Sequence, residues 1–231
     1  MHSMSSMPRA RSQVAASFQL ETPRFDPEDP AVRAGAAALR SELGLTGHRV
    51  VLFAGKFHPR KQPVPLLEAF LAVAGPQDAL VFVGDGPERP RLEALAASRP
   101  DRTVRLLPFA NQTEMPARYA LADIFALPSQ GSYETWGLAV NEAMHLGEPC
   151  LVSDLVGCHA DLVLPGKTGW VFPAADPAAL ATTLADALRL PADELARLGR
   201  QARALSAGFT YRETTAGLLA ALAALRGPSP S

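Results

Sequence analysis

The chain has 231 residues, of which 48% are apolar and 19% are charged, and this balance excludes a wholly disordered protein. Its formal net charge of −1 excludes a general nucleic-acid binder, which needs an excess of Lys and Arg. No apolar run approaches the about 20 residues of a membrane-spanning helix. The two cysteines, Cys150 and Cys158, are too few for the disulfide framework of a small secreted protein. We therefore expect a cytoplasmic protein with free thiols.

Residues 1–28 are predicted to form a loose tail or linker, because they include a polar, proline-rich stretch and lack the apolar block of a secretory signal. Asp29 and Pro30 then begin a predicted helix, since an Asp cap followed by Pro at the first helical position is a typical start signal. We predict one folded domain over residues 29–227 and a short tail over 228–231.

Short apolar runs alternate with helical patterns along this domain. The predicted strands are 49–55, 79–86, 103–107, 123–129, 149–154 and 169–172. Helices are predicted between most of them, and three more follow the last strand: one capped by Asp176, one over 191–205 and one over 211–225. This order predicts an α/β fold, a single doubly wound, Rossmann-like domain of about six parallel strands with extra C-terminal helices. In such sheets ligands bind beyond the carboxyl ends of the strands, so the segment after each strand is a candidate for the site.

The segment after the first strand, GKFHPRK, carries two lysines. Gly55 allows a sharp turn, and Lys56 and Lys61 follow it at a spacing of five. Two ammonium groups over one loop could neutralise a diphosphate. The alternative is a solvated basic loop.

The segment after the second strand, GDGPER, is similar to part of a dinucleotide-binding fingerprint. Gly84 and Gly86 permit the backbone to approach a ligand closely, and a plain tight turn explains them as well. Arg89 stands where G-x-G-x-x-G has its third glycine, which disfavours a NAD-binding domain. The segment after the third strand is predicted to form a pocket wall, with Thr113 or Asn111 capping the next helix.

The segment after the fourth strand contains SYETWGLAVNEAM, which places Glu134 and Glu142 eight positions apart. A helix is predicted to begin near Trp136 or Gly137, with its free N–H groups and positive dipole end at the ligand edge of the sheet. Glu134 could then accept hydrogen bonds from ligand hydroxyls, and Glu142 could contact another part of a long ligand. The structural alternatives are a capping acid for Glu134 and a surface helix acid for Glu142.

In this order, GKFHPRK, VGDGP, ADIFALPSQGSYETWGLAVNEAMHLGEP and SDLVGC resemble the C-terminal, donor-binding domain of a group 1 (family 4) retaining glycosyltransferase of the GT-B fold. The resemblance runs from about Gly55 to Asp186. It implies that the domain over residues 29–227 binds a nucleotide-diphospho-sugar and that transfer retains the anomeric configuration.

The resemblance also implies a role for each site residue. The catalytic residues would be Glu134, which would bind hydroxyls of the donor sugar, and Lys56 and Lys61, which would bind the diphosphate. Lys56 stands where an arginine is common, so a bidentate grip is lost while the charge remains. Glu142 would accept hydrogen bonds from the ribose. The other donor-binding residues would be Gly55, Gly84 and Gly86 in the loops, Pro108 and Phe109 near the base, and Thr135, Trp136, Gly137 and Leu138 through backbone N–H groups.

No metal or other cofactor is expected for this reaction. The chain contains no D-x-D tripeptide, the motif with which many glycosyltransferases hold a metal ion. Two lysines and a helix N-terminus could stabilise the departing diphosphate in its place.

A complete GT-B enzyme has a second domain, which binds the acceptor and comes first in the chain. The first matching strand begins near residue 49, which leaves no room for that domain. We therefore expect a donor-binding half that needs an N-terminal domain or a partner chain to bring a glycan, lipid or small-molecule acceptor. The missing half could bring the protein to the inner membrane surface, and an apolar face left open would favour self-association. The alternative is a non-catalytic nucleotide-sugar-binding module or a truncated accessory subunit.

Overall fold

The computed structural model describes residues 24–131, 133–209, 215 and 219, and the described residues up to Ala207 belong to one compact unit. A six-stranded sheet runs through this unit in the order β3-β2-β1-β4-β5-β6, and all neighbouring strands are parallel. The strands are β1 (Arg49–Ala54), β2 (Asp78–Val83), β3 (Thr103–Leu107), β4 (Ile124–Leu127), β5 (Cys150–Ser153) and β6 (Gly169–Phe172). The predicted α/β fold with about six parallel strands is confirmed.

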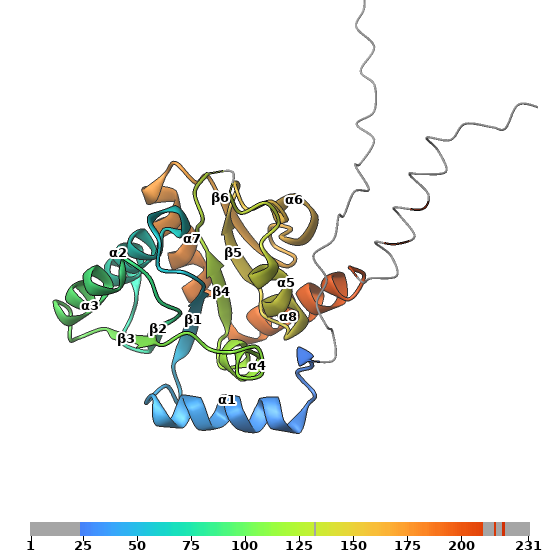
Figure 1. Cartoon of the computed structure of the whole chain (residues 1–231), viewed down its shortest axis with the longest axis horizontal. Helices are drawn as coiled ribbons and strands as arrows, with labels where there is room; N and C mark the ends of the chain where they lie inside the picture. Colours follow the sequence, from blue (N-terminus) through green and yellow to red (C-terminus); the bar gives the residue numbers. More distant parts are fainter. Residues whose placement is uncertain (1–23, 132, 210–214, 216–218, 220–231) are drawn as a thin grey trace, which may run out of the picture. The chain divides into compact units, whose positions relative to one another are not determined.

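The helices cover both faces of the sheet (Figure 1). They are α1 (Pro30–Glu42), the 3-10 turn η2 (Pro59–Lys61), α2 (Pro63–Val73), α3 (Arg89–Ala97), α4 (Met115–Ala120), α5 (Leu138–His145), α6 (His159–Leu162), α7 (Pro177–Arg189) and α8 (Ala192–Ser206). On one face α2 packs against both α3 and α7, and on the other α1, α4, α5 and α8 contact one another in series. With both faces covered, β1, β2, β4 and β5 are almost wholly buried, which is why their sequences read as continuous apolar runs.

Local signals in the sequence set several helix starts. Asp29 caps α1 by accepting a hydrogen bond from the Ala31 N–H at 2.8 Å, and Asp176 caps α7 by accepting from Ala178 at 2.9 Å. Both caps were predicted. The prediction that Thr113 or Asn111 caps the helix after β3 is wrong, because the N-cap of α4 is Glu114 and no side chain caps this helix; the Asn111 side chain instead accepts from the Glu114 N–H, at 3.0 Å, within the preceding turn.

The order of the strands reverses between β1 and β4. Crossovers from β1 lead outward through β2 to β3 on one side, and crossovers from β4 lead through β5 to β6 on the other. Doubly wound sheets bind ligands beyond the carboxyl ends of the strands at such a reversal, so the loops after β1 and β4 are the expected place for a site.

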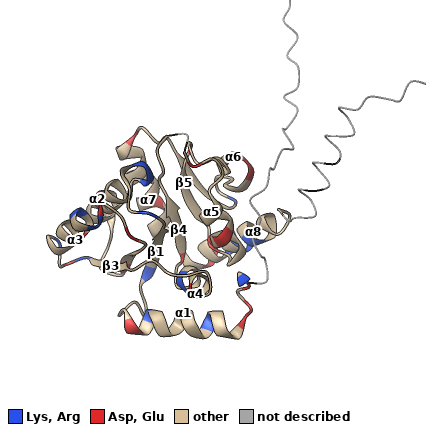
Figure 2. Ribbon diagram, viewed as in Figure 1, with Lys and Arg blue, Asp and Glu red and all other residues tan. Residues whose placement is uncertain are grey.

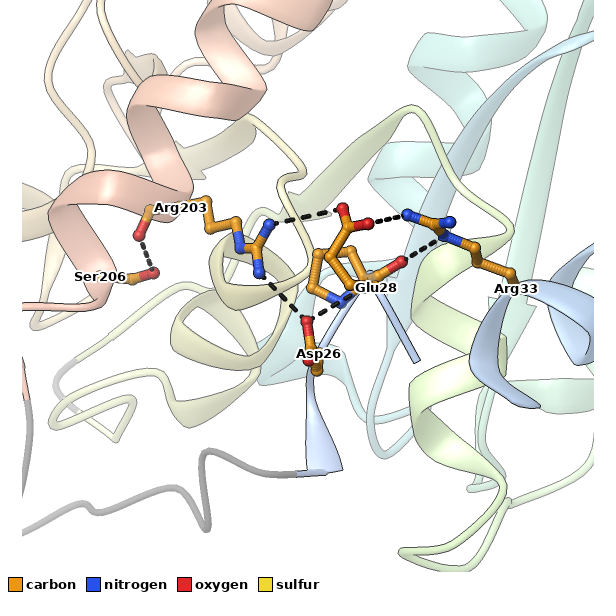
Figure 3. Close-up of polar contacts among 6 residues, drawn as sticks. Asp26, Glu28, Arg33, Arg203 and Ser206 are labelled. Carbon is orange, nitrogen blue, oxygen red and sulfur yellow. Dashed lines mark hydrogen bonds and ion pairs between the residues drawn. The ribbon is translucent and has the colours of Figure 1, made fainter. Parts of the chain in front are cut away.

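An ion-pair network joins α8 to the segment before α1 (Figure 3). Arg203 lies 3.1 Å from Asp26 and 3.8 Å from Glu28, and Glu28 also pairs with Arg33. Phe25, in the same segment, is only 7% exposed. Residues 24–28 thus pack against the domain, although we predicted them as part of the loose tail.

Some predictions concern residues that the structure does not describe. They are the tail over residues 1–23, the helix over 211–225 apart from residues 215 and 219, and the tail over 228–231. Among the described helices, none combines the length and apolar character needed to cross a membrane.

Candidate functional site

A small cleft lies between the segments that follow β1 and β4, where the strand order reverses. Its volume is about 240 Å³, and it is lined by Lys56, His58, Arg60, Lys61, Ser129, Gln130, Tyr133 and Glu134. A backbone hydrogen bond from Gln130 N–H to the Arg60 carbonyl, at 2.7 Å, joins the two segments. Three predicted site residues, Lys56, Lys61 and Glu134, therefore meet in one cleft.

Lys61 and Glu134 form an ion pair across this cleft. The Lys61 Nζ lies 2.6 Å from Glu134 Oε2, and the Ser129 hydroxyl donates to the same oxygen at 3.2 Å. The two side chains are 27% and 18% exposed, so water screens the pair only in part. Glu134 is not the capping acid of the structural alternative, because Gly137 is the N-cap of α5 and the Glu134 carboxylate accepts from Lys61 and Ser129 instead.

Lys56 supplies a second positive charge to the cleft. Its side chain is exposed, and no ion pair joins it to any acid among the described residues. Because Glu134 already offsets the charge of Lys61, Lys56 is the cation of this pair that remains uncompensated. A negatively charged group in the cleft would be attracted by it.

Arg60 and Tyr133 form one wall of the cleft, which the sequence did not reveal. The Arg60 guanidinium lies 3.7 Å from the centre of the Tyr133 ring, within the range of a cation–π contact. The Tyr133 side chain nevertheless remains 66% exposed. Each residue looks like an ordinary loop residue in the sequence, and only the pairing of the two loops brings them together.

Glu142 lies on α5 and is bound by a residue of α4. The Tyr119 hydroxyl donates to Glu142 Oε2 at 2.7 Å, and Tyr119 is only 1% exposed. Burial raises the pKa of the Glu142 carboxyl above its usual value, and the hydrogen bond from Tyr119 opposes that rise. Glu142 is partly buried and is not the surface helix acid of the structural alternative.

The glycines at the ends of β1 and β2 bring two loops together. A Cβ added to Gly84 would lie 2.0 Å from the carbonyl oxygen of Gly55, and one added to Gly86 would lie 2.5 Å from that of Phe57. Their φ angles of 148° and 154° also favour glycine. Neighbouring backbone therefore makes the close approach at Gly84 and Gly86 that we expected a ligand to make.

Arg89 fills the space between the ends of β2 and β3. Its guanidinium donates to the carbonyl oxygens of Gly84, at 2.7 Å, and Leu107, at 3.3 Å, and it pairs with Asp85 at 3.0 Å. A dinucleotide fingerprint needs a small residue here for close packing between helix and strand. The geometry therefore agrees with the sequence in disfavouring a NAD-binding site.

The turn before α5 is held by the segment after β5. Backbone bonds run from Gly157 N–H to the Glu134 carbonyl at 2.9 Å and from Cys158 N–H to the Trp136 carbonyl at 2.8 Å. Gly137 has a φ of 95° and ends this turn, so α5 begins at Leu138. The predicted donor-binding backbone from Thr135 to Leu138 thus has a fixed path beside the cleft.

Pro108 and Phe109, which follow β3, are both exposed, and Phe109 is 78% exposed. An exposed aromatic ring at the carboxyl edge is available to stack on a planar base. Both residues lie outside the lining of the cleft itself.

The two thiols are buried and poorly suited to nucleophilic chemistry. Burial raises the pKa of the Cys158 thiol to about 12 and moves that of Cys150 well above its usual value. A thiolate is the reactive form of cysteine, and neither residue forms it readily at neutral pH.

A larger hollow, of about 940 Å³, lies at the opposite, amino-terminal edge of the sheet. It is lined in part by Arg49, Asp78, Asp123 and Glu148, which stand at the starts of strands or just before them. None of the predicted site residues lines it. The predicted site residues therefore gather at the smaller cleft and not at the larger hollow.

Charges of both signs are interspersed on the helices in the view of Figure 2. α1 carries Arg33, Arg40 and Glu42, and α3 carries Arg89, Arg91 and Glu93. Neither helix presents a uniformly basic face of the kind that tracks a nucleic-acid backbone.

Comparison with known proteins gives a consistent result. Residues 37–205 match the family model described as glycosyl transferases group 1. The chain is 34% identical over 200 residues to a D-inositol 3-phosphate glycosyltransferase of Nocardia farcinica. The aligned region covers 79% of this chain and 42% of that protein. The chain is also 34% identical over 183 residues to a GDP-mannose-dependent alpha-(1-6)-phosphatidylinositol monomannoside mannosyltransferase of Mycolicibacterium smegmatis, covering 74% of this chain and 46% of that one. The chain thus spans somewhat less than half the length of these relatives.

The fold is similar to that of solved structures. Anabaena Alr3699/HepE in complex with UDP-glucose matches with a TM-score of 0.74 at 21% identity, over 89% of this chain and 56% of that one. The sucrose-phosphate synthase of Thermosynechococcus elongatus matches with a TM-score of 0.71 at 26% identity, over 90% of this chain and 52% of that one.

Proposed function

Since the chain belongs to the group 1 glycosyl transferases, we propose that it is the donor-binding half of a retaining, metal-independent glycosyltransferase. The observation that carries this proposal is the cleft at the strand reversal, which gathers Lys56, Lys61 and Glu134 beside the start of α5. These residues offer positive charge and a carboxylate at the place where a doubly wound sheet binds its ligand.

The proposed chemistry follows from the charges in the cleft. As the bond between the sugar and the diphosphate breaks, negative charge accumulates on the leaving diphosphate. The ammonium groups of Lys56 and Lys61 stabilise this charge, together with the backbone N–H groups at the start of α5. This electrostatic role is the one a metal ion has in other transferases, and we therefore expect no metal requirement.

Glu134 has two tasks in this scheme. Its ion pair fixes the Lys61 ammonium at 2.6 Å before any ligand binds, so little reorganisation is needed when the diphosphate arrives. Its carboxylate also accepts hydrogen bonds from hydroxyls of the donor sugar. Glu142 accepts from the ribose hydroxyls, and Pro108 and Phe109 contact the base beside Gly84 and Gly86.

The acceptor is bound by residues outside this chain, in a longer parent protein or a partner chain. Exposed apolar side chains support this assignment. Of the five large apolar residues that the described part of the chain leaves exposed, four follow the ends of β3, β4 and β5. They are Phe109, Tyr133, Leu138 and Leu155. An acceptor domain closing over the carboxyl edge would cover them.

The function is tested by calorimetric titration of the purified chain with UDP-, GDP- and ADP-sugars. We expect one nucleotide class to bind, and Glu142→Ala to weaken that binding by about 1.5–3 kcal/mol, the contribution of a hydrogen bond to a charged group. Glu42→Ala is the matched control, because Glu42 is an exposed acid on α1, far along the chain from the site. Absence of binding for every nucleotide class would contradict the proposal.

A non-catalytic nucleotide-sugar-binding module is the second candidate, because the same cleft could hold a donor without transferring its sugar. A binding module of this kind would give the same binding result in the titration. It would transfer no sugar to any acceptor, even when an acceptor domain from a relative is added. Transfer under those conditions would exclude it.

A further inference from the structure

Tyr119 connects the buried core to the acid that we assign to the ribose. It lies on α4, and its hydroxyl donates to Glu142 Oε2 on α5 at 2.7 Å. With 1% of Tyr119 exposed and Glu142 only partly buried, the hydrogen bond joins a buried ring to a partly exposed carboxylate. No sequence motif marked Tyr119.

The Tyr119 ring is held in place by two aromatic neighbours. Phe25 packs edge-on against it with ring centres 6.1 Å apart, and Phe125 of β4 packs at 5.6 Å. Since Phe125 is fully buried in the sheet and Phe25 is 7% exposed, the ring cannot swing away without opening the core. The hydroxyl therefore has a fixed position.

A fixed donor also fixes the carboxylate it binds. A glutamate side chain has several rotatable bonds, and a binding site gains affinity when such freedom is lost before the ligand arrives. Tyr119 occupies Oε2, and Oε1 of Glu142 has no hydrogen-bond partner among the described residues. The Tyr119 hydroxyl thus decides which carboxylate oxygen stays available.

We propose that Tyr119 is a positioning residue for the donor site, whose hydroxyl holds Glu142 so that its second oxygen accepts hydrogen bonds from the ribose. This inference rests on the proposed function, and it adds a residue on a separate helix to the recognition of the ribose. The competing explanation is that Glu142 only satisfies a buried tyrosine hydroxyl, which needs a partner of its own.

The test compares a nucleoside diphosphate of the preferred base with its 2′,3′-dideoxy analogue, by calorimetry, on wild type and Tyr119→Phe. The substitution removes the hydroxyl and leaves every ring contact in place. We expect wild type to bind the ribose form more tightly than the dideoxy form. In Tyr119→Phe the ratio of the two affinities should be about tenfold smaller, which corresponds to the loss of one ordinary hydrogen bond. Affinity for the dideoxy analogue should be the same in both proteins.

Each other outcome contradicts a defined part of the scheme. If wild type prefers the ribose form and Tyr119→Phe keeps the full preference, the positioning role of Tyr119 is wrong. A wild type that binds both forms equally well removes Glu142 as the ribose acceptor, and Tyr119 with it. A wild type that binds neither form overturns the proposed function itself.

Glu142→Gln provides a second variant with almost unchanged shape, in case Tyr119→Phe folds poorly. If Tyr119 fixes the side chain, the Gln carbonyl oxygen accepts from Tyr119 and the amide NH2, a donor, faces the ribose. The ribose preference should then fall by about tenfold. If Tyr119 does not fix it, the Gln can turn its carbonyl oxygen to the ribose, and a retained preference would overturn the proposal.

Discussion

At the scale of the residue, the proposed site depends on two glutamates, and other side chains hold each of them. Glu134 is paired with Lys61 from the loop after β1, and Glu142 is bound by Tyr119 from α4. In both cases the partner restricts the movement of an acid that we assign to the donor site. We therefore expect the proposed donor site to be organised before a ligand binds, which would lower the entropic cost of recognition.

The sequence predicted the positions of these acids better than their contacts. Glu134 and Glu142 could be singled out because both fall in one segment after a predicted strand. Lys61 lies 73 positions from Glu134, and Tyr119 lies 23 positions from Glu142. Contacts over such separations depend on how loops and helices pack, which local patterns do not encode. The roles of the individual site residues stay predictions.

A third acid, Glu148, gives a test of burial at the residue scale. It is 3% exposed, and neither carboxylate oxygen has a hydrogen-bond partner among the described residues. Burial, reinforced by the nearby Asp123, raises the pKa of the Glu148 carboxyl well above its usual value. In the unfolded chain the Glu148 carboxyl releases its proton near pH 4.5, whereas in the folded protein it keeps that proton to a higher pH. Stability should fall as the pH rises above 4.5, by up to about 1.4 kcal/mol per pH unit.

We predict that Glu148→Gln, which cannot ionise, melts at a higher temperature than wild type at pH 8. The difference should shrink toward pH 4, where Glu148 is protonated in both states. Thermal denaturation at several pH values measures this, with the exposed Glu42→Gln as control. A difference in melting temperature that does not change with pH would show that ionisation of Glu148 is not involved.

At the scale of the element, the loops at the carboxyl ends of the strands shape the crevice. The first predicted strand, 49–55, differs from β1 (Arg49–Ala54) by one residue, since continuous apolar runs mark buried parallel strands clearly. The helix expected near Trp136 or Gly137 begins at Leu138, because Gly137 adopts a left-handed conformation that ends the turn. What the sequence could not show is that Gly84 and Gly86 are approached by other backbone.

We predict that Gly84→Ala destabilises the protein strongly, because the added Cβ would lie 2.0 Å from the Gly55 carbonyl oxygen. Gly47→Ala is the matched control, since Gly47 also has a positive φ, of 81°, but an added Cβ meets nothing within 4 Å. Gly47→Ala should cost only about 1–2 kcal/mol of backbone strain. Urea denaturation of both variants measures the difference, and equal losses would mean that the close approach at Gly84 has little effect on stability.

At the scale of the whole molecule, the alternation of strands and helices determined the fold class. Doubly wound order follows from short parallel crossovers, so the sheet and its covering helices could be predicted from the sequence. The packing of residues 24–28 could not, because their contacts with α8 and Tyr119 are made by residues distant in sequence. Two hollows result at opposite edges of the sheet, and the larger one carries none of the predicted site residues.

Backbone hydrogen exchange, measured with and without the nucleotide-sugar that titration selects, tests the location of the donor site most directly. We predict slower exchange on binding in residues 55–61, 84–86 and 133–142, and unchanged exchange in residues 47–49 and 146–149 around the larger hollow. Protection confined to the larger hollow, or no protection in any of these segments, would contradict a donor site at the strand reversal.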